Sequence, residues 1–249
     1  MDKFINFYKF GVNAWLAVVL LVMNRSMITF TFAAIPTPEV MDQTLISPVN
    51  SPLILPDGFS SIPITPEIET RIRGISYSEN CPVPLSSLRY LTVLHIGFDG
   101  QIYAGELIVH ERIAPLVLEI FYQLYLVGYP IEKIRLIDDY NANDEASMTD
   151  NNTSAFCCRT IAGTDTLSLH SYGLAVDINP LYNPYVNGDR IAPATSAYNR
   201  ETGTVSSPHF MTEGDYCVKL FQAYGFTWGG EWNGVKDYQH FELHCQNAE

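Results

Sequence analysis

The segment from Leu174 to Asn179 most constrains the fold, because its side chains alternate between two chemical kinds. The apolar positions are Leu174, Val176 and Ile178, and the positions between them are Ala175, Asp177 and Asn179. This period of two is typical of a β-strand with one face against a core. Asn179-Pro180 ends the strand. His170 lies upstream, across a turn that Gly173 permits, so we expect His170 and Asp177 to reach one cleft.

A second segment near the end of the chain, KDYQHFEL at residues 236–243, repeats this alternation. Phe241 and Leu243 form its apolar face, while His240 and Glu242 project from the other face. His170, Asp177 and His240 together make a set of two histidines and one carboxylate. Catalytic zinc sites use three such ligands and leave the fourth position to water. Asp237, three residues before His240, is then a free carboxylate near that water.

The rest of the chain from about residue 72 has the pattern of one domain. Residues 89–98 and 101–110 predict a β-hairpin around Asp99-Gly100. Residues 112–127 have apolar side chains at helical spacing and stop at Gly128. Residues 131–138 predict a short strand, 139–165 an irregular polar stretch, 181–212 a long loop, 214–224 a short helix and 237–244 a final strand. This mixture predicts an α+β fold with an antiparallel sheet and helices on one side of it.

The N-terminal part differs from this domain. Lys3 and Lys9 precede an apolar run, residues 10–23, that suits the core of a signal peptide. We expect residues 1–34 to be a signal peptide, with an uncleaved membrane anchor as the alternative, and hence an exported protein. Residues 35–71 are proline-rich and predict an extended linker or wrapping arm. Residues 72–249 form the predicted domain.

Charge and cysteine content narrow the class of protein. The net charge of -13 argues against binding of nucleic acid, which calls for a basic patch. Five cysteines allow up to two disulfides with one thiol left over, and export favours pairing. The adjacent Cys157 and Cys158 cannot pair with each other without strain. The sequence leaves the connectivity open.

The stretch SLHSYGLAVD resembles the Ser-x-His-x-x-Gly-x-Ala-x-Asp signature of zinc peptidases that include D-alanyl-D-alanine carboxypeptidases, D,D-dipeptidases and L-alanyl-D-glutamate endopeptidases. The later GFTWGGEW and KDYQHFEL are similar to the endopeptidase branch, in which Asp-x-x-His replaces Glu-x-x-His. The similarity extends through NNTSAFCCR and ENCPVPLSSLRYL, over roughly residues 75–244. The resemblance implies a hedgehog/DD-peptidase fold.

The resemblance also implies the roles of individual residues. His170, Asp177 and His240 become the ligands of Zn2+, Asp237 the general acid/base, and Arg159 the group that steadies the substrate carbonyl and its developing oxyanion. A surface salt bridge is the alternative for Arg159. The implied substrate is a peptidoglycan stem peptide. The bond can be of the D-Ala-D-Ala or the L-Ala-D-Glu type, so carboxypeptidase and endopeptidase activity both stay open.

Two other functions compete with this one. A non-catalytic, zinc-containing cell-wall-binding module of the same fold would not need the carboxylate of Asp237. A cysteine peptidase would use Cys157 or Cys158 as its nucleophile, beside Arg159. For several side chains near the predicted site, two roles also stay open. Glu242 orients a ligand histidine or lies on the surface, Trp228 and Trp232 line the cleft or pack in the core, and Glu231 competes for proton transfer.

Overall fold

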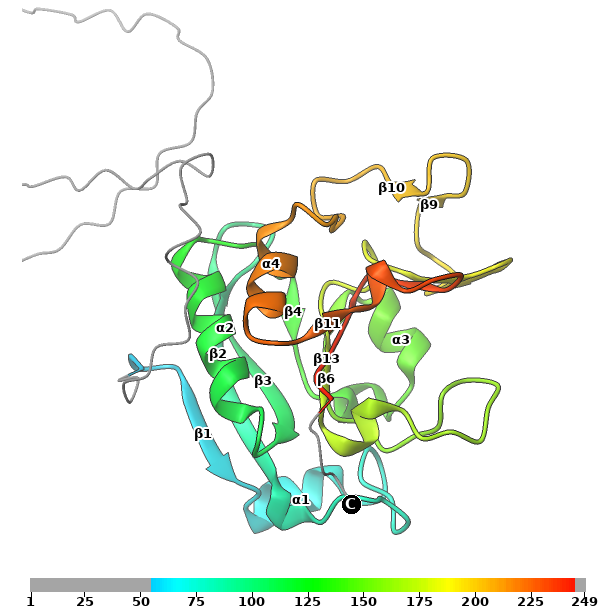
Figure 1. Cartoon of the computed structure of the whole chain (residues 1–249). Helices are drawn as coiled ribbons and strands as arrows, with labels where there is room; N and C mark the ends of the chain where they lie inside the picture. Colours follow the sequence, from blue (N-terminus) through cyan, green and yellow to red (C-terminus); the bar gives the residue numbers. More distant parts are fainter. Residues whose placement is uncertain (1–54, 245–249) are drawn as a thin grey trace, which may run out of the picture. The chain divides into compact units, whose positions relative to one another are not determined.

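The computed structural model describes residues 55–244, and the first half of this range is built on a three-stranded antiparallel sheet (Figure 1). Its strands are β1 (Ser60–Pro63), β2 (Leu88–Ile96) and β3 (Ile102–His110), with β2 in the middle. The hairpin β2–β3 confirms the prediction, and its register pairs Leu88 with His110 and Ile96 with Ile102. Helix α2 (Ala114–Leu126) lies across this sheet and buries its apolar stripe, as its sequence pattern predicts.

The part of the predicted linker that the structure describes is folded, which corrects the boundary at residue 71. Strand β1 pairs with β2, and helix α1 (Pro66–Ile72) follows it. Prolines permit both elements, since Pro63 ends an edge strand and Pro66 occupies the first helical turn, where no backbone N–H is needed. Thr65 caps the helix by accepting a hydrogen bond from the Ile68 backbone N–H.

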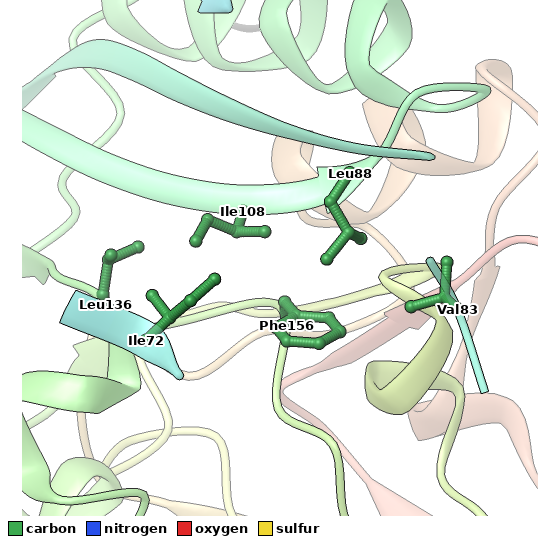
Figure 2. Packing of buried hydrophobic residues seen from close by; sticks show 6 residues of the cluster. All are labelled: Ile72, Val83, Leu88, Ile108, Leu136 and Phe156. Atoms are coloured by element: carbon green, nitrogen blue, oxygen red, sulfur yellow. The ribbon is translucent and has the colours of Figure 1, made fainter. Parts of the chain in front are cut away.

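An apolar cluster holds these early elements to the later part of the chain (Figure 2). Ile72 at the end of α1 is fully buried in it. The cluster joins residues that lie far apart in the sequence: Ile72, Val83, Leu88, Ile108, Leu136 and Phe156. The folded domain therefore begins before residue 72, while predictions for residues 1–54 fall outside the described residues.

The second half is made of short strands. Strands β11 (Thr227–Trp228), β13 (His240–Glu242) and β6 (Ala175–Asp177) form one antiparallel sheet, with β13 in the middle. Strands β12 (Lys236–Asp237), β7 (Tyr185–Asn187) and β8 (Arg190–Ala192) form another, with β7 in the middle. Two further pairs are the parallel β4 (Lys133–Ile134) and β5 (Asn152–Thr153), and the antiparallel β9 (Tyr198–Asn199) and β10 (Thr204–Val205).

The predicted α+β class is confirmed, but several small sheets replace the one that we expected. The predicted strand at 237–244 is divided, because β12 and β13 pair in different sheets. The predicted irregular stretch 139–165 contains α3 (Asp144–Thr149), which Asn143 caps through its side chain. The predicted helix at 214–224 is α4 (Tyr216–Ala223). Between residues 55 and 244, no helix combines the length and the apolar character needed to cross a membrane.

Candidate metal centre and its pocket

His170 is positioned by a short 3₁₀ helix that leads into β6. The helix spans Leu169–Tyr172, and Ser168 caps it by accepting a hydrogen bond from the His170 backbone N–H. Gly173 ends it at φ 68°. A side chain at Gly173 would collide with the backbone of Val109 and His110, so the turn requires glycine twice over.

Asp177 and His240 come together because β6 and β13 pair with these two residues directly opposite each other. The Nδ1 atom of His240 lies 2.9 Å from Asp177 Oδ1 and 3.2 Å from His170 Nε2. His170 Nε2 in turn lies 3.2 Å from Asp177 Oδ2. The three side chains are buried and offer one ligand atom each, a set that could hold a metal ion.

Hydrogen bonds outside this cluster decide which nitrogen of each imidazole faces inward. His170 Nδ1 donates to the carbonyl oxygen of Ala155 at 2.5 Å, which leaves Nε2 as the inward atom. His240 Nε2 donates to Glu242 Oε2 at 3.0 Å, which leaves Nδ1 as the inward atom. A partner on the outer nitrogen is typical of histidines that bind metals. Glu242 thus takes the orienting position that the sequence left as one of two alternatives.

The members of the cluster shift one another's pKa values strongly. Burial acts to lower the pKa of His240, but its hydrogen bonds to Asp177 and Glu242 outweigh burial and raise the pKa to about 10. Burial acts in the opposite sense on Asp177, and the two histidines hold the pKa of this carboxyl well below its usual range. The carboxylate of Asp177 is therefore ionised, as a metal ligand must be.

The cluster lies at the wall of a pocket of about 440 Å³. Asp237 lines the same pocket, but it belongs to β12 and pairs across to Tyr185 of β7. Its Oδ1 accepts a hydrogen bond from Gln239 Nε2 at 3.2 Å. Burial raises the pKa of Asp237 to about 6, which is near the range that suits a general acid/base at neutral pH.

Gly229 allows the strand that carries Asp237 to come close. A Cβ atom at this position would lie 2.5 Å from the carbonyl oxygen of Asp237 and 2.8 Å from its Cβ. Only glycine leaves room for this approach without a shift of one backbone or the other. The close approach of Asp237 therefore explains why the first glycine of the pair in GFTWGGEW, Gly229, is a glycine.

Arg159 also lines the pocket, but it has a partner that the sequence did not reveal. Its Nε lies 2.6 Å from Oδ2 of Asp144, the first residue of α3. The structure thus brings Arg159 to the predicted site and gives it an ion pair there. Asn143 is an N-cap signal for α3, but no sequence signal links Asp144 to Arg159 because loops separate them.

The other candidate site residues from the sequence lie in the pocket, in the core or on the surface. Trp232 lines the pocket, with its ring 5.4 Å from that of His240, whereas Trp228 is buried and donates to the carbonyl of Tyr238. Glu231 is exposed and accepts a hydrogen bond from Gln222, away from the residues that line the pocket. Cys157 is buried, and burial raises the pKa of its thiol to about 12. That thiol is a poor nucleophile, which disfavours Cys157 as the nucleophile of a cysteine peptidase.

Comparison with known proteins agrees with the motifs. Residues 162–243 match the family described as D-alanyl-D-alanine carboxypeptidase. This match confirms the resemblance for a segment that contains the three members of the cluster and Asp237, while Arg159 precedes it. No curated protein and no solved structure matches the chain significantly.

Proposed function

We propose that this relative of the D-alanyl-D-alanine carboxypeptidase family is a zinc-dependent peptidase that hydrolyses the stem peptides of peptidoglycan. The observation that carries the proposal is the buried cluster of His170, Asp177 and His240 with a separate carboxylate, Asp237, in the same pocket. The family match supports the choice of peptide hydrolysis. A hedgehog/DD-peptidase fold is part of the same proposal.

The cluster fits zinc by its geometry and its donor atoms. A tetrahedral ion with Zn–N distances of about 2.0–2.1 Å has ligand atoms about 3.3 Å apart. The three separations here are 2.9 to 3.2 Å. Two imidazoles and one carboxylate also form a common donor set of catalytic zinc. When bound there, zinc would supply Lewis-acid chemistry and a water of lowered pKa.

Asp237 is the proton carrier in this proposal. Its carboxylate accepts a proton from the attacking water and delivers it to the nitrogen of the leaving amine. The raised pKa favours both steps, since the group must gain and lose a proton near neutral pH. A binding module would have no use for this second carboxylate, which is why we prefer catalysis over the non-catalytic alternative.

In this proposal, Arg159 stabilises the carbonyl oxygen of the substrate. Its ion pair with Asp144 engages Nε and holds the guanidinium at the pocket wall. The Nη atoms are then left to donate hydrogen bonds to an oxygen that gains negative charge. Trp232 supplies an aromatic wall beside His240. These residues bind and orient the peptide.

The substitution Asp237→Asn tests the proposal, because it keeps the size of the side chain and removes its ability to take a proton. General acid–base catalysis contributes about 100- to 10,000-fold, so kcat on purified muropeptides should fall by that order. Zinc content should stay at the wild-type level, as measured by elemental analysis. Mass spectrometry of the products would also identify the bond that is cleaved.

Glu231→Gln is the matched control, since Glu231 lies outside the residues that line the pocket. Its kcat and zinc content should equal those of the wild type. Wild-type protein that binds zinc and cleaves no muropeptide would refute the peptidase. Loss of zinc in Asp237→Asn would instead make Asp237 a ligand.

We also propose that the protein acts outside the cytoplasmic membrane, where peptidoglycan is found. The basic start and apolar run of residues 1–34 support export, with or without retention in the membrane. Cell fractionation with N-terminal sequencing tests this. Recovery of the full-length chain from the cytosol would contradict it.

A further inference from the structure

Two cysteines lie at the contact between residues 76–81 and residues 156–158. The backbone N–H of Cys158 donates to the carbonyl of Ser76 at 2.9 Å, and the hydroxyl of Ser78 donates to Cys158 Sγ at 3.4 Å. The N–H of Cys81 donates to the carbonyl of Ser78 at 3.2 Å, which turns the chain back toward Cys158. These hydrogen bonds hold the two segments side by side.

Both cysteines also pack against the apolar cluster described above. Val83 and Phe156, close in sequence to Cys81 and Cys158, are members of that cluster. The Cys81 thiol donates a hydrogen bond to the carbonyl oxygen of Ser171 at 3.7 Å. Burial and the neighbouring Cys158 thiol raise the pKa of Cys81 to about 12. Both cysteines are partly buried, and a bond between them requires an adjustment that brings the two sulfur atoms to about 2.05 Å.

The other described cysteines have different surroundings. Cys157 is more buried than Cys158, and its backbone N–H donates a hydrogen bond to the backbone carbonyl oxygen of His170. Cys217 is fully buried in helix α4. Cys81 and Cys158 are therefore the matched pair.

We propose that Cys81 and Cys158 are a modification site at which a disulfide forms. The oxidant is a second disulfide, of a small molecule or of an exchange protein. One cysteine thiolate attacks it and releases a thiol, and the other thiolate then displaces the second thiol from the mixed disulfide. The protein loses two protons and two electrons, and the oxidant is reduced to two thiols. The two sulfur atoms of the protein end in one S–S bond.

The bond would hold together two segments of the chain, one of which carries residues of the site. It joins the segment after α1 to the segment that carries Ala155, whose carbonyl orients His170, and Arg159. It also closes a long loop that contains β2, β3 and α2, and long loops give the largest loss of entropy in the unfolded chain. We therefore expect the bridge to stabilise the folded domain.

Peptide mapping of the full chain tests the pairing directly. The protein is equilibrated in a buffer of glutathione and glutathione disulfide, alkylated after denaturation, digested and analysed by mass spectrometry. We expect one linked pair of peptides that contains Cys81 and Cys158 and disappears on reduction, with Cys157 and Cys217 alkylated. Alkylated Cys81, or a link from Cys81 to Cys157 or Cys245, would overturn the proposal.

Thermal unfolding tests the bracing role. Reduction of the bridge in the wild type should lower Tm by on the order of 10 °C. Cys81→Ser and Cys158→Ser should each lose this response to reductant, and the control Cys157→Ser should keep it. If a serine variant does not fold, the peptide map of the wild type still decides the pairing. An unchanged Tm after the bridge has been reduced would refute the bracing.

Discussion

At the scale of single residues, the candidate centre depends on atoms that lie outside the three-residue cluster. Ala155 and Glu242 each accept a hydrogen bond from the outer nitrogen of one histidine. This contact sets the ring orientation and leaves the other nitrogen facing Asp177. Glu242 also accepts a hydrogen bond from the exposed His244. Its carboxylate is therefore held in place from two sides.

Glu242→Gln should weaken zinc binding, because an amide is a poorer acceptor for the His240 N–H than a carboxylate. Loss of such a partner typically costs 10- to 100-fold in metal affinity, so we expect a decrease of about that size. Competition with a chromophoric chelator measures it. Glu231→Gln is again the control, with unchanged affinity expected. Equal affinities in the two variants would show that Glu242 does not act on the metal site.

At the scale of elements, two neighbouring strands divide the chemistry between them. Strand β13 places His240 opposite Asp177 of β6, while β12 places Asp237 in a different sheet. The chain changes sheets within the two residues between these strands. In the proposed mechanism, metal binding and proton transfer would therefore depend on different backbone pairings, so that a local change affects one without the other.

Gly229→Ala should separate these two functions. The new methyl group would meet the backbone and Cβ of Asp237 at less than 3 Å, so Asp237 must move. A displacement of about 1 Å in an active site can cost about 100-fold in rate. We expect kcat on muropeptides to fall by that order while zinc content is retained, because β13 is not touched.

Gly214→Ala is the matched control for Gly229→Ala. Its nearest neighbour would be the Thr212 hydroxyl oxygen at 3.9 Å, which is ordinary contact. Activity of this control should equal that of the wild type. Full activity in Gly229→Ala would mean that Asp237 need not hold its present position for catalysis.

At the scale of the whole folded domain, the metal centre joins parts of the chain that are distant in sequence. His170 and His240 are 70 residues apart, and the segment at Ala155 adds a third contact. Zinc bound to all three ligands would link these segments only in the folded state. Binding of this kind stabilises a protein by mass action.

Removal of zinc should therefore lower the thermal stability of the protein. Free zinc at 100 times its Kd adds about 2.7 kcal/mol, and a domain of about 150–250 residues shifts by about 2–4 °C per kcal/mol. A chelator should thus lower Tm by about 5–10 °C in a calorimetric scan. Asp177→Ala, which lacks one ligand, should show no such shift. The same chelator effect in both proteins would contradict the ligand assignment.

Local patterns in the sequence determined the elements that do not depend on distant partners. The hairpin β2–β3 and helix α2 follow from residue periodicity and from the glycine at each turn, because these signals are local in the sequence. The motif SLHSYGLAVD predicted that His170 and Asp177 meet, because a turn and a strand of fixed geometry connect them. The family match covers the same part of the chain.

Only the tertiary structure decided the features that join distant segments. The pairing of His240 with Asp177 is a matter of strand register, and the division of residues 236–242 between two sheets has no local signal. The ion pair of Asp144 with Arg159 and the packing of Cys81 and Cys158 against one apolar cluster are of the same kind. In each case, the residues near either side chain in the sequence give no signal that predicts the contact. The physical reason is that such contacts form when the apolar faces of separate elements pack into a common core, and local periodicity does not encode which faces meet.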